Sequence, residues 1–151
     1  MKISILGIDP GPTESAYCLI DDSYQIIAAD KIKNEDLLNV MDAMQLVHVA
    51  IESIQSYGMP VGREVFDTCY MIGRIIQRCD DTCVPYTLIP RPEYTRRICG
   101  VGKVTDAILR QALLLRFGGD KKGEPLSQLK GASDKRSAFA VAAYLLDKER
   151  S

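Results

Sequence analysis

Three short apolar runs follow one another at the start of the chain, with only turn-sized segments between them. They are Ile3 to Asp9, Ala16 to Ile20 and Gln25 to Ile32. Pro10-Gly11-Pro12 and Asp21-Asp22-Ser23 mark the connections, and neither connection has room for a helix. Strands joined by such short turns pair antiparallel, so the sequence predicts a three-stranded meander.

The middle of the chain alternates between helical and strand-like patterns. Asn34 is predicted to cap a helix that begins with Glu35 and Asp36. A strand is expected over 46–54, a helix over 63–79 and a short strand over 84–89. Helices between strands favour crossovers onto one sheet.

The last third is predicted to be largely helical. A short helix is expected over 92–99, and a second, capped by Thr105, is expected to end near Phe117. We expect a mobile loop over 118–131 and a final helix with Ser133 as its N-cap. The length of 151 residues favours a single domain over 1–151. The whole order predicts an α/β fold with a mixed five-stranded sheet flanked by helices.

Charge is distributed unevenly along the chain. Residues 1–90 carry a net charge of −7 and residues 91–151 a net charge of +6, although the total is only −1. Such asymmetry fits a protein that meets a polyanion with part of its surface, and it is equally compatible with ordinary solvated surface.

Cysteine number and hydropathy indicate the compartment. Five cysteines without a secretion signal indicate reduced thiols in a cytosol. Zinc binding is disfavoured because Cys79 and Cys83 have no second Cys/His pair at ligand spacing. No apolar run is long enough for a membrane span, and Met1 to Ser4 is predicted to lead into a strand.

Three carboxylates stand where a metal site would need them. Asp9 ends the first strand, Glu52 lies near the end of the fourth, and Asp134 lies in the first turn of the last helix. Unpaired carboxylates in apolar surroundings are costly unless they share a cation. Mg²⁺ prefers oxygen ligands, and two such ions can flank a scissile phosphate. The three acids are therefore candidate ligands of a catalytic metal site.

Each acid also has a simpler interpretation. Asp9 before a proline and a glycine can be a turn former. Glu52 can face solvent on an edge strand, and Asp134 can stabilise a helix N-terminus through the dipole.

Longer motifs carry a family resemblance. Gly7-Ile8-Asp9-Pro10-Gly11 resembles the first-strand signature of RuvC-type Holliday-junction resolvases of the RNase H-like superfamily. Its extension to Ala16, and the stretch from Ser56 to Cys69 with Ile72-Gly73-Arg74, are similar to a phage and prophage branch of that family. The segment from Ser133 to Ala142 resembles the family's last catalytic helix. The resemblance runs from about residue 3 to about residue 147.

The resemblance implies an RNase H type of sheet and an activity. Asp9, Glu52 and Asp134 would be the catalytic metal ligands, with Mg²⁺, or Mn²⁺ in its place, and two ions expected. The implied protein is a homodimer in a bacterial or phage-infected cytosol that cuts opposed strands of a four-way DNA junction.

One departure affects the expected metal site. Where bacterial members of the family place a second acid three residues after the first acid of the last helix, this chain has Ser137, a possible accessory residue. A hydroxyl can orient a water but does not supply the charge. Glu14, Glu64 and Asp106 are alternative acids.

Basic residues supply candidate DNA contacts, because Lys and Arg make most phosphate contacts. The candidates are Arg63, Arg74, Arg96, Arg97, Lys103, Lys135 and Arg136. Tyr57 can stack on an unpaired base or serve as a structural lid. Arg74 can instead pair with Glu64 or Asp67.

Four functions remain open from the sequence. The first is an endonuclease that resolves four-way junctions, and the second is a nuclease for other branched or hybrid duplexes. The third is a junction-binding protein with weak or lost catalysis, for which Ser137 is the motivating feature. The last is an unrelated activity such as nucleotide binding.

Overall fold

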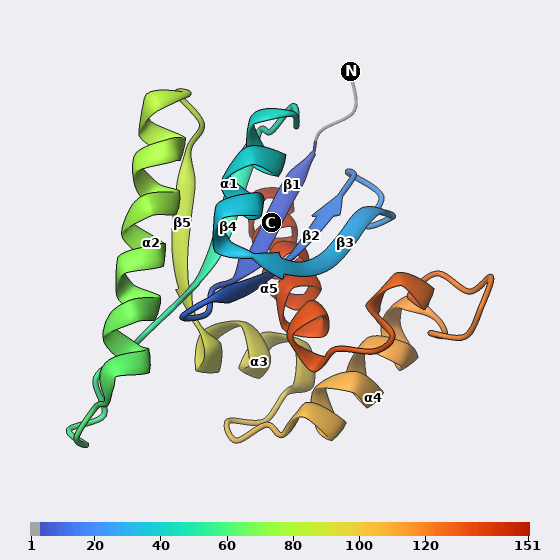
Figure 1. Cartoon of the computed structure of the whole chain (residues 1–151). Helices are drawn as coiled ribbons and strands as arrows, with labels where there is room; N and C mark the ends of the chain where they lie inside the picture. The colour runs from blue at the N-terminus through green and yellow to red at the C-terminus, as the bar shows by residue number, and fades with distance from the viewer. Residues whose placement is uncertain (1–3) are drawn as a thin grey trace.

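The computed structural model describes residues 4–151 and has one five-stranded sheet in the order β3-β2-β1-β4-β5 (Figure 1). The strands are β1 (Ile5–Asp9), β2 (Glu14–Ile20), β3 (Ile26–Lys33), β4 (His48–Ser53) and β5 (Tyr86–Pro90). The first three pair antiparallel, whereas β1, β4 and β5 run parallel. The predicted meander and mixed sheet are confirmed. Met1 to Ile3, where the first strand was expected to begin, lie outside the described residues.

The helices lie on both faces of this sheet. They are α1 (Asn34–Asp42), α2 (Arg63–Asp81), α3 (Arg91–Cys99), α4 (Asp106–Phe117) and α5 (Ser133–Arg150), together with a short 3-10 helix, η1 (Ser127–Leu129). Buried residues of α1 and α2 share one hydrophobic core with the sheet, and those of α3, α4, η1 and α5 share the other. Figure 1 shows α5 behind β1 and α1 in front of it.

Strand β1 lies between these two cores. Leu6 and Ile8 belong to the core under α1 and α2, whereas Ile5 belongs to the core under α5. Because side chains alternate along a strand, Asp9 points to the same face as Ile5. In β4 the same alternation puts Glu52 on the face of Ala50, again towards α5.

A glycine lets helix α5 lie directly against β1. A Cβ atom at Gly7 would be 2.0 Å from the carbonyl oxygen of Ala138 and 2.8 Å from the Cβ of Ala142. Only glycine fits such a close approach of backbone to backbone. This contact fixes the N-terminal turn of α5, which carries Asp134, near the end of β1.

Two predicted helix caps are wrong and one is confirmed. Asn34 is already helical, and its buried side chain accepts a hydrogen bond from Ser15 Oγ (2.7 Å) and donates one to the carbonyl of Gly11 (3.1 Å). Ala132, not Ser133, is the N-cap of α5. Thr105 caps α4 by accepting a hydrogen bond from the amide of Ile108 at 3.2 Å. Asn34 does not act as the N-cap because its side chain instead connects the start of α1 to Gly11, in the loop after β1, and to Ser15.

The segment 118–131 is more structured than the mobile loop that was predicted. It contains η1, and Leu126 and Leu129 are buried in the core under α5. Asp120 accepts two hydrogen bonds from Arg110 of α4, at 2.9 and 3.1 Å.

The structure also describes the state of the cysteines and the apolarity of the helices. All five cysteines are free thiols. Among the helices of residues 4–151, none has the length and apolarity needed to cross a membrane.

Candidate active site

The carboxyl ends of the parallel strands bring two of the three predicted acids together. Asp9 is the last residue of β1, and Glu52 is the last but one of β4. Ile8 pairs with Ile51 in the parallel ladder, so the next residues, Asp9 and Glu52, are neighbours across it. Both project to the face that α5 covers, so the two carboxylates meet at one edge of the sheet.

Asp134 reaches the same edge from α5. The pKa of Asp9 is raised to about 9, first by burial and then by the charges and hydrogen bonding of Glu52 and Asp134. A shift with these causes requires both other carboxylates to be close to Asp9. The structure therefore brings the three predicted residues together, with Asp9 in contact with both of the others.

A lysine that sequence reasoning did not single out holds Asp134. Lys31 of β3 lies 2.7 Å from Asp134 Oδ2 through its Nζ atom, and this ion pair raises the pKa of Lys31. The sheet register explains the contact, because Lys31 pairs with Ala16 and Ala16 pairs with Asp9. These residues line a recess of about 260 Å³ between β1, β3 and α5, whose members are Asp9, Pro10, Gly11, Pro12, Thr13, Glu14, Lys31 and Asp134.

Glu52 is held from the other side by two residues of α3. The hydroxyl of Tyr94 donates a short hydrogen bond to Glu52 Oε1, and Arg91 Nη1 lies 3.8 Å from the same oxygen. Burial, and then the charge of Glu52, raise the pKa of Tyr94, so its hydroxyl stays protonated as a donor.

Ser137 belongs to the same polar network. It is buried one helical turn after Asp134, and its Oγ accepts a hydrogen bond from Arg91 Nη1 at 3.1 Å. Arg91 also donates to the Tyr94 hydroxyl at 3.1 Å and, through Nη2, to Asp106 at 3.3 Å. The hydroxyl of Ser137 is thus already hydrogen-bonded to the positively charged guanidinium of Arg91.

The donor set fits a hard divalent cation but is not assembled around one. No group of three or more His, Cys, Asp or Glu side chains within residues 4–151 is arranged to hold a metal ion. Asp134 is paired with Lys31, and Glu52 contacts Arg91 and Tyr94. The donors are carboxylate oxygens, which Mg²⁺ and Mn²⁺ prefer, and Asp9 is partly buried beside the other two carboxylates. A bound ion would compete with Lys31 for Asp134, which is 43% exposed.

The other acids considered as substitutes have different positions. Glu14 lines the recess beside Asp9, and Asp106 contacts Arg91. Glu64 lies exposed in the first turn of α2.

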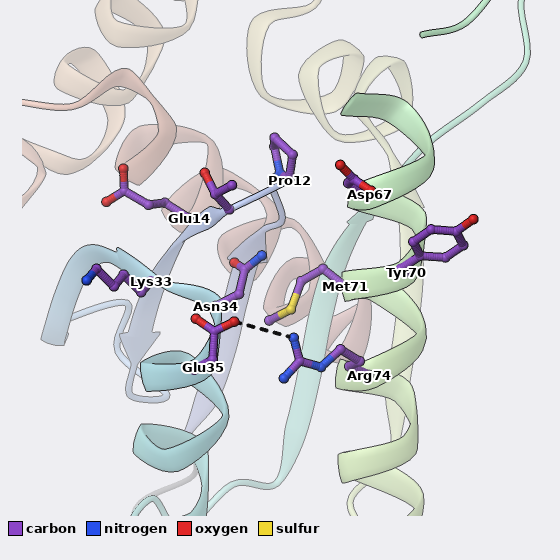
Figure 2. Close-up of a pocket in the computed structure, with 10 residues that line it drawn as sticks. Pro12, Glu14, Lys33, Asn34, Glu35, Asp67, Tyr70, Met71 and Arg74 are labelled. Atoms are coloured by element: carbon purple, nitrogen blue, oxygen red, sulfur yellow. Dashed lines mark ion pairs between the residues drawn. The ribbon is translucent and has the colours of Figure 1, made fainter. Parts of the chain in front are cut away.

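Two of the predicted DNA contacts on α2 pair with acids. Arg63 is 93% exposed and lies 3.7 Å from Asp67, one turn further along the helix. Arg74 pairs with Glu35 of α1 at 3.9 Å, so its expected alternative partners, Glu64 and Asp67, are incorrect. Figure 2 shows this pair across a groove of about 600 Å³ between α1 and α2.

The other predicted contacts lie on α3, in the turn after it and at the start of α5. Arg96 and Lys103 are exposed on α3 and the turn after it, and Lys135 is half-buried next to Asp134. Lys103 and Tyr57 line a shallow groove of about 160 Å³ with Arg91 and Thr95. Whether these residues contact DNA stays a prediction.

Sequence reasoning did not identify Lys31, Arg91 or Tyr94 as site residues. A signal existed for the last two, since Arg91 and Tyr94 follow the strand β5, which ends at the same edge as Asp9 and Glu52. Predicting Lys31 as a site residue would require the register of two antiparallel strand pairs, which the sequence does not provide.

Comparison with solved structures identifies the fold. RuvC of Thermus thermophilus in complex with a Holliday junction substrate superposes with a TM-score of 0.77 and 14% identity, covering 98% of this chain and 95% of that one. Another Thermus thermophilus RuvC structure gives a TM-score of 0.73 and 13% identity, over 98% and 96%. The chain therefore has the RNase H-like fold of these RuvC structures, as predicted.

Sequence comparison adds nothing to this structural likeness. No protein-family model matches the chain, and no curated protein matches its sequence. The predicted phage-type branch thus stays a prediction.

Proposed function

We propose that this chain is a divalent-metal-dependent endonuclease that resolves four-way DNA junctions. The observation that carries the proposal is the meeting of Asp9, Glu52 and Asp134 at one sheet edge. The shared fold supports it, because a RuvC with that fold is known in complex with a Holliday junction.

The chemistry of the three acids supports a metal-dependent hydrolysis. A bound Mg²⁺ or Mn²⁺ would polarise the phosphodiester and lower the pKa of an attacking water. Asp9, Glu52 and Asp134 would hold the ion, and burial of Asp9 makes its charge costly until a cation is present. Ser137, bound to Arg91, would act as an accessory residue.

The basic groove beside the acids supports binding of a nucleic acid backbone. Arg91 borders both Glu52 and the groove that Lys103 and Tyr57 line. A phosphate on Arg91 would therefore lie next to the carboxylates. Further phosphate contacts in this proposal are Arg63, Arg74, Arg96, Lys103 and Lys135. The proposed place of action is the cytosol, where the protein would reach DNA.

A homodimer would match the near two-fold symmetry of a four-way junction. The outer face of α2 supports one, because Phe66, Cys69, Tyr70 and Gly73 are exposed there at helical spacing. Phe66 is 51% exposed and Tyr70 68% exposed. We name Phe66, Cys69, Tyr70 and Gly73 the α2 stripe and propose that it packs on a second copy.

Cleavage of labelled junctions tests the function. With Mg²⁺ the full chain is expected to introduce paired nicks into a four-way junction, faster than into flap or hybrid duplexes. Asp9→Asn is expected to lower the rate at least 100-fold, because the amide no longer provides a carboxylate ligand. Asp80→Asn, which removes an exposed carboxylate at the end of α2, is the matched control and should cut like the parent.

The outcome against the proposal is equally clear. Asp9→Asn with parental activity would show that the site is misassigned. Preference for flaps or hybrids would replace the substrate and leave the nuclease in place.

The second candidate is a junction-binding protein with weak catalysis. The favouring observation is that Lys31 and Arg91 already neutralise two of the acids, while Ser137 adds no charge. Tight junction binding in Ca²⁺ together with no cleavage in Mg²⁺ or Mn²⁺ would select this candidate.

A further inference from the structure

Arg91 is the strongest unexplained feature of the site. Its guanidinium reaches Ser137 Oγ at 3.1 Å, Tyr94 Oη at 3.1 Å and Glu52 Oε1 at 3.8 Å. It is held between β5 and α5, because it opens α3 immediately after β5. The position of this charge is therefore fixed by the same elements that position the acids.

A second divalent ion at the Glu52 end would stand close to this charge. Arg91 carries a planar guanidinium, which stays positively charged in proteins. Like charges repel strongly in a partly buried site. Ser137, at this same end, is neutral and cannot offset the repulsion.

The recess of about 260 Å³ that Asp9 and Asp134 line has room for an ion. Arg91 and Tyr94 contact Glu52 through Oε1, which leaves Oε2 to act as a ligand. Asp9 lies close to both Glu52 and Asp134, and it lines this recess together with Asp134.

We propose that this site takes a single divalent ion, and that Arg91 supplies the second positive charge by binding the scissile phosphate. The inference rests on the proposed nuclease function. It assigns to Arg91, a residue of the chain, the role expected of a second metal ion.

Asp106 indicates how the phosphate would reach Arg91. Its carboxylate accepts a hydrogen bond from Arg91 Nη2 at 3.3 Å, and its side chain is 60% exposed. A phosphate offers the same oxygen acceptors, and an exposed ion pair is easily exchanged. Arg91 also lines the shallow groove with Lys103 and Tyr57. DNA would thus replace Asp106 on Nη2, while Nη1 keeps its contacts with Ser137 and Tyr94.

Arg91 variants separate this role from simple DNA binding. Arg91→Met is expected to lower kcat at least 100-fold and to change junction affinity in Ca²⁺ less than fivefold, because one phosphate contact among many is lost. Arg91→Lys keeps the charge but not the planar fork, and we expect an intermediate kcat. Lys122→Met, which removes an exposed charge from the 118–131 segment, is the matched control.

Counting bound Mn²⁺ gives a readout that does not depend on activity. Mn²⁺ titrations followed by electron paramagnetic resonance would be run on the full chain, alone and with cleaved junction product. We expect one Mn²⁺ per chain in both, and one in Arg91→Lys. Circular dichroism checks folding, and Arg91→Lys carries the kinetic test if Arg91→Met does not fold.

The results separate this inference from the proposed function. Two Mn²⁺ per chain, or an Arg91 variant with kcat within threefold of the parent, would overturn the role of Arg91 and leave the nuclease intact. A parent chain that neither cuts DNA nor binds Mn²⁺ would overturn the function itself.

Discussion

Asp9 shows the conflict between function and stability within one side chain. It is partly buried at the end of β1 with two other carboxylates as neighbours, and its pKa is raised from 3.8 to about 9. The unfolded chain has neither the burial nor these neighbours. In the absence of metal, raising the pH to neutrality therefore lowers the free energy of unfolding, because Asp9 ionises freely only in the unfolded chain.

The first stability prediction concerns Asp9→Asn without metal. The folded pKa is the raised one, so the stability that Asp9 contributes is full below about pH 4 and declines as pH rises towards 9. Asp9→Asn removes this decline, and we expect it to stabilise the metal-free protein at pH 8 by roughly 1–3 kcal/mol. Thermal unfolding in EDTA at pH 4, 6 and 8 measures the effect.

Metal provides the internal control for this prediction. Saturating Mg²⁺ is expected to stabilise the parent more than Asp9→Asn, because binding to the native state adds to its stability. Equal stability of parent and variant at pH 8 would show that the charge of Asp9 is compensated within the protein.

Lys31 leads to a prediction about metal affinity. Its ion pair with Asp134 is half-exposed on both sides, at 39% and 43%, so it contributes at most about 1 kcal/mol. A metal ion has to displace it, so Lys31→Met should tighten Mn²⁺ binding by about two- to fivefold. Calorimetric titration compares the variant with Lys33→Met, an exposed lysine of the same strand. Weaker binding would mean that Lys31 assists the ion.

Residues of the site differed in how well the sequence predicted them. Asp9, Glu52 and Asp134 stand out because each interrupts or borders an apolar run, which is a local signal. Lys31 and Arg91 carry no such signal, since charged residues are ordinary on exposed strands and helix starts. Their roles follow from partners 103 and 46 positions away in the sequence.

At the scale of elements, the packing of α5 on β1 positions Asp134. The helix is buried along most of its length, from Ser137 to Asp147. Gly7 permits the contact, and small residues of α5 meet it. Sequence periodicity predicted both elements, but neither their close approach nor the loss of the Asn34 and Ser133 caps, because both depend on tertiary contacts.

Gly7→Ala tests this packing. The added Cβ would meet the backbone oxygen of Ala138 at 2.0 Å, so α5 would have to move, and we expect a loss of about 2–4 kcal/mol. Gly102→Ala is the control, since its Cβ would meet nothing closer than 3.8 Å. Urea unfolding of both variants measures the difference. A small effect at Gly7 would mean that α5 shifts cheaply, and then the position of Asp134 would not be fixed by this contact.

At the scale of the molecule, the order of elements could be predicted because strand-like and helical runs alternate clearly. The register between β1, β2 and β3 could not, because it depends on hydrogen bonds between distant residues. The uneven charge has a clearer meaning in the structure. Arg91, Arg96 and Lys103 of the basic part lie on α3 and the turn after it, and Arg91 contacts Glu52 of the acidic part.

The last prediction concerns the number of chains that act together. Phe66→Arg with Tyr70→Glu places opposite charges in the α2 stripe, and burying them in an apolar contact is unfavourable. We expect the dimer to weaken at least 100-fold, while folding is unchanged because both side chains are exposed. Sedimentation at several protein concentrations measures this.

Cleavage products then connect assembly to function. A monomer carries one set of acids, so the double variant should produce single nicks where the parent produces paired ones. Leu115→Glu is the matched control, because Leu115 of α4 is 88% exposed and lies outside the α2 stripe. If Leu115→Glu dissociates the protein and the double variant does not, the two-fold contact lies on α4. A parent that is monomeric at every concentration would instead require the four-way junction itself to bring the two chains together.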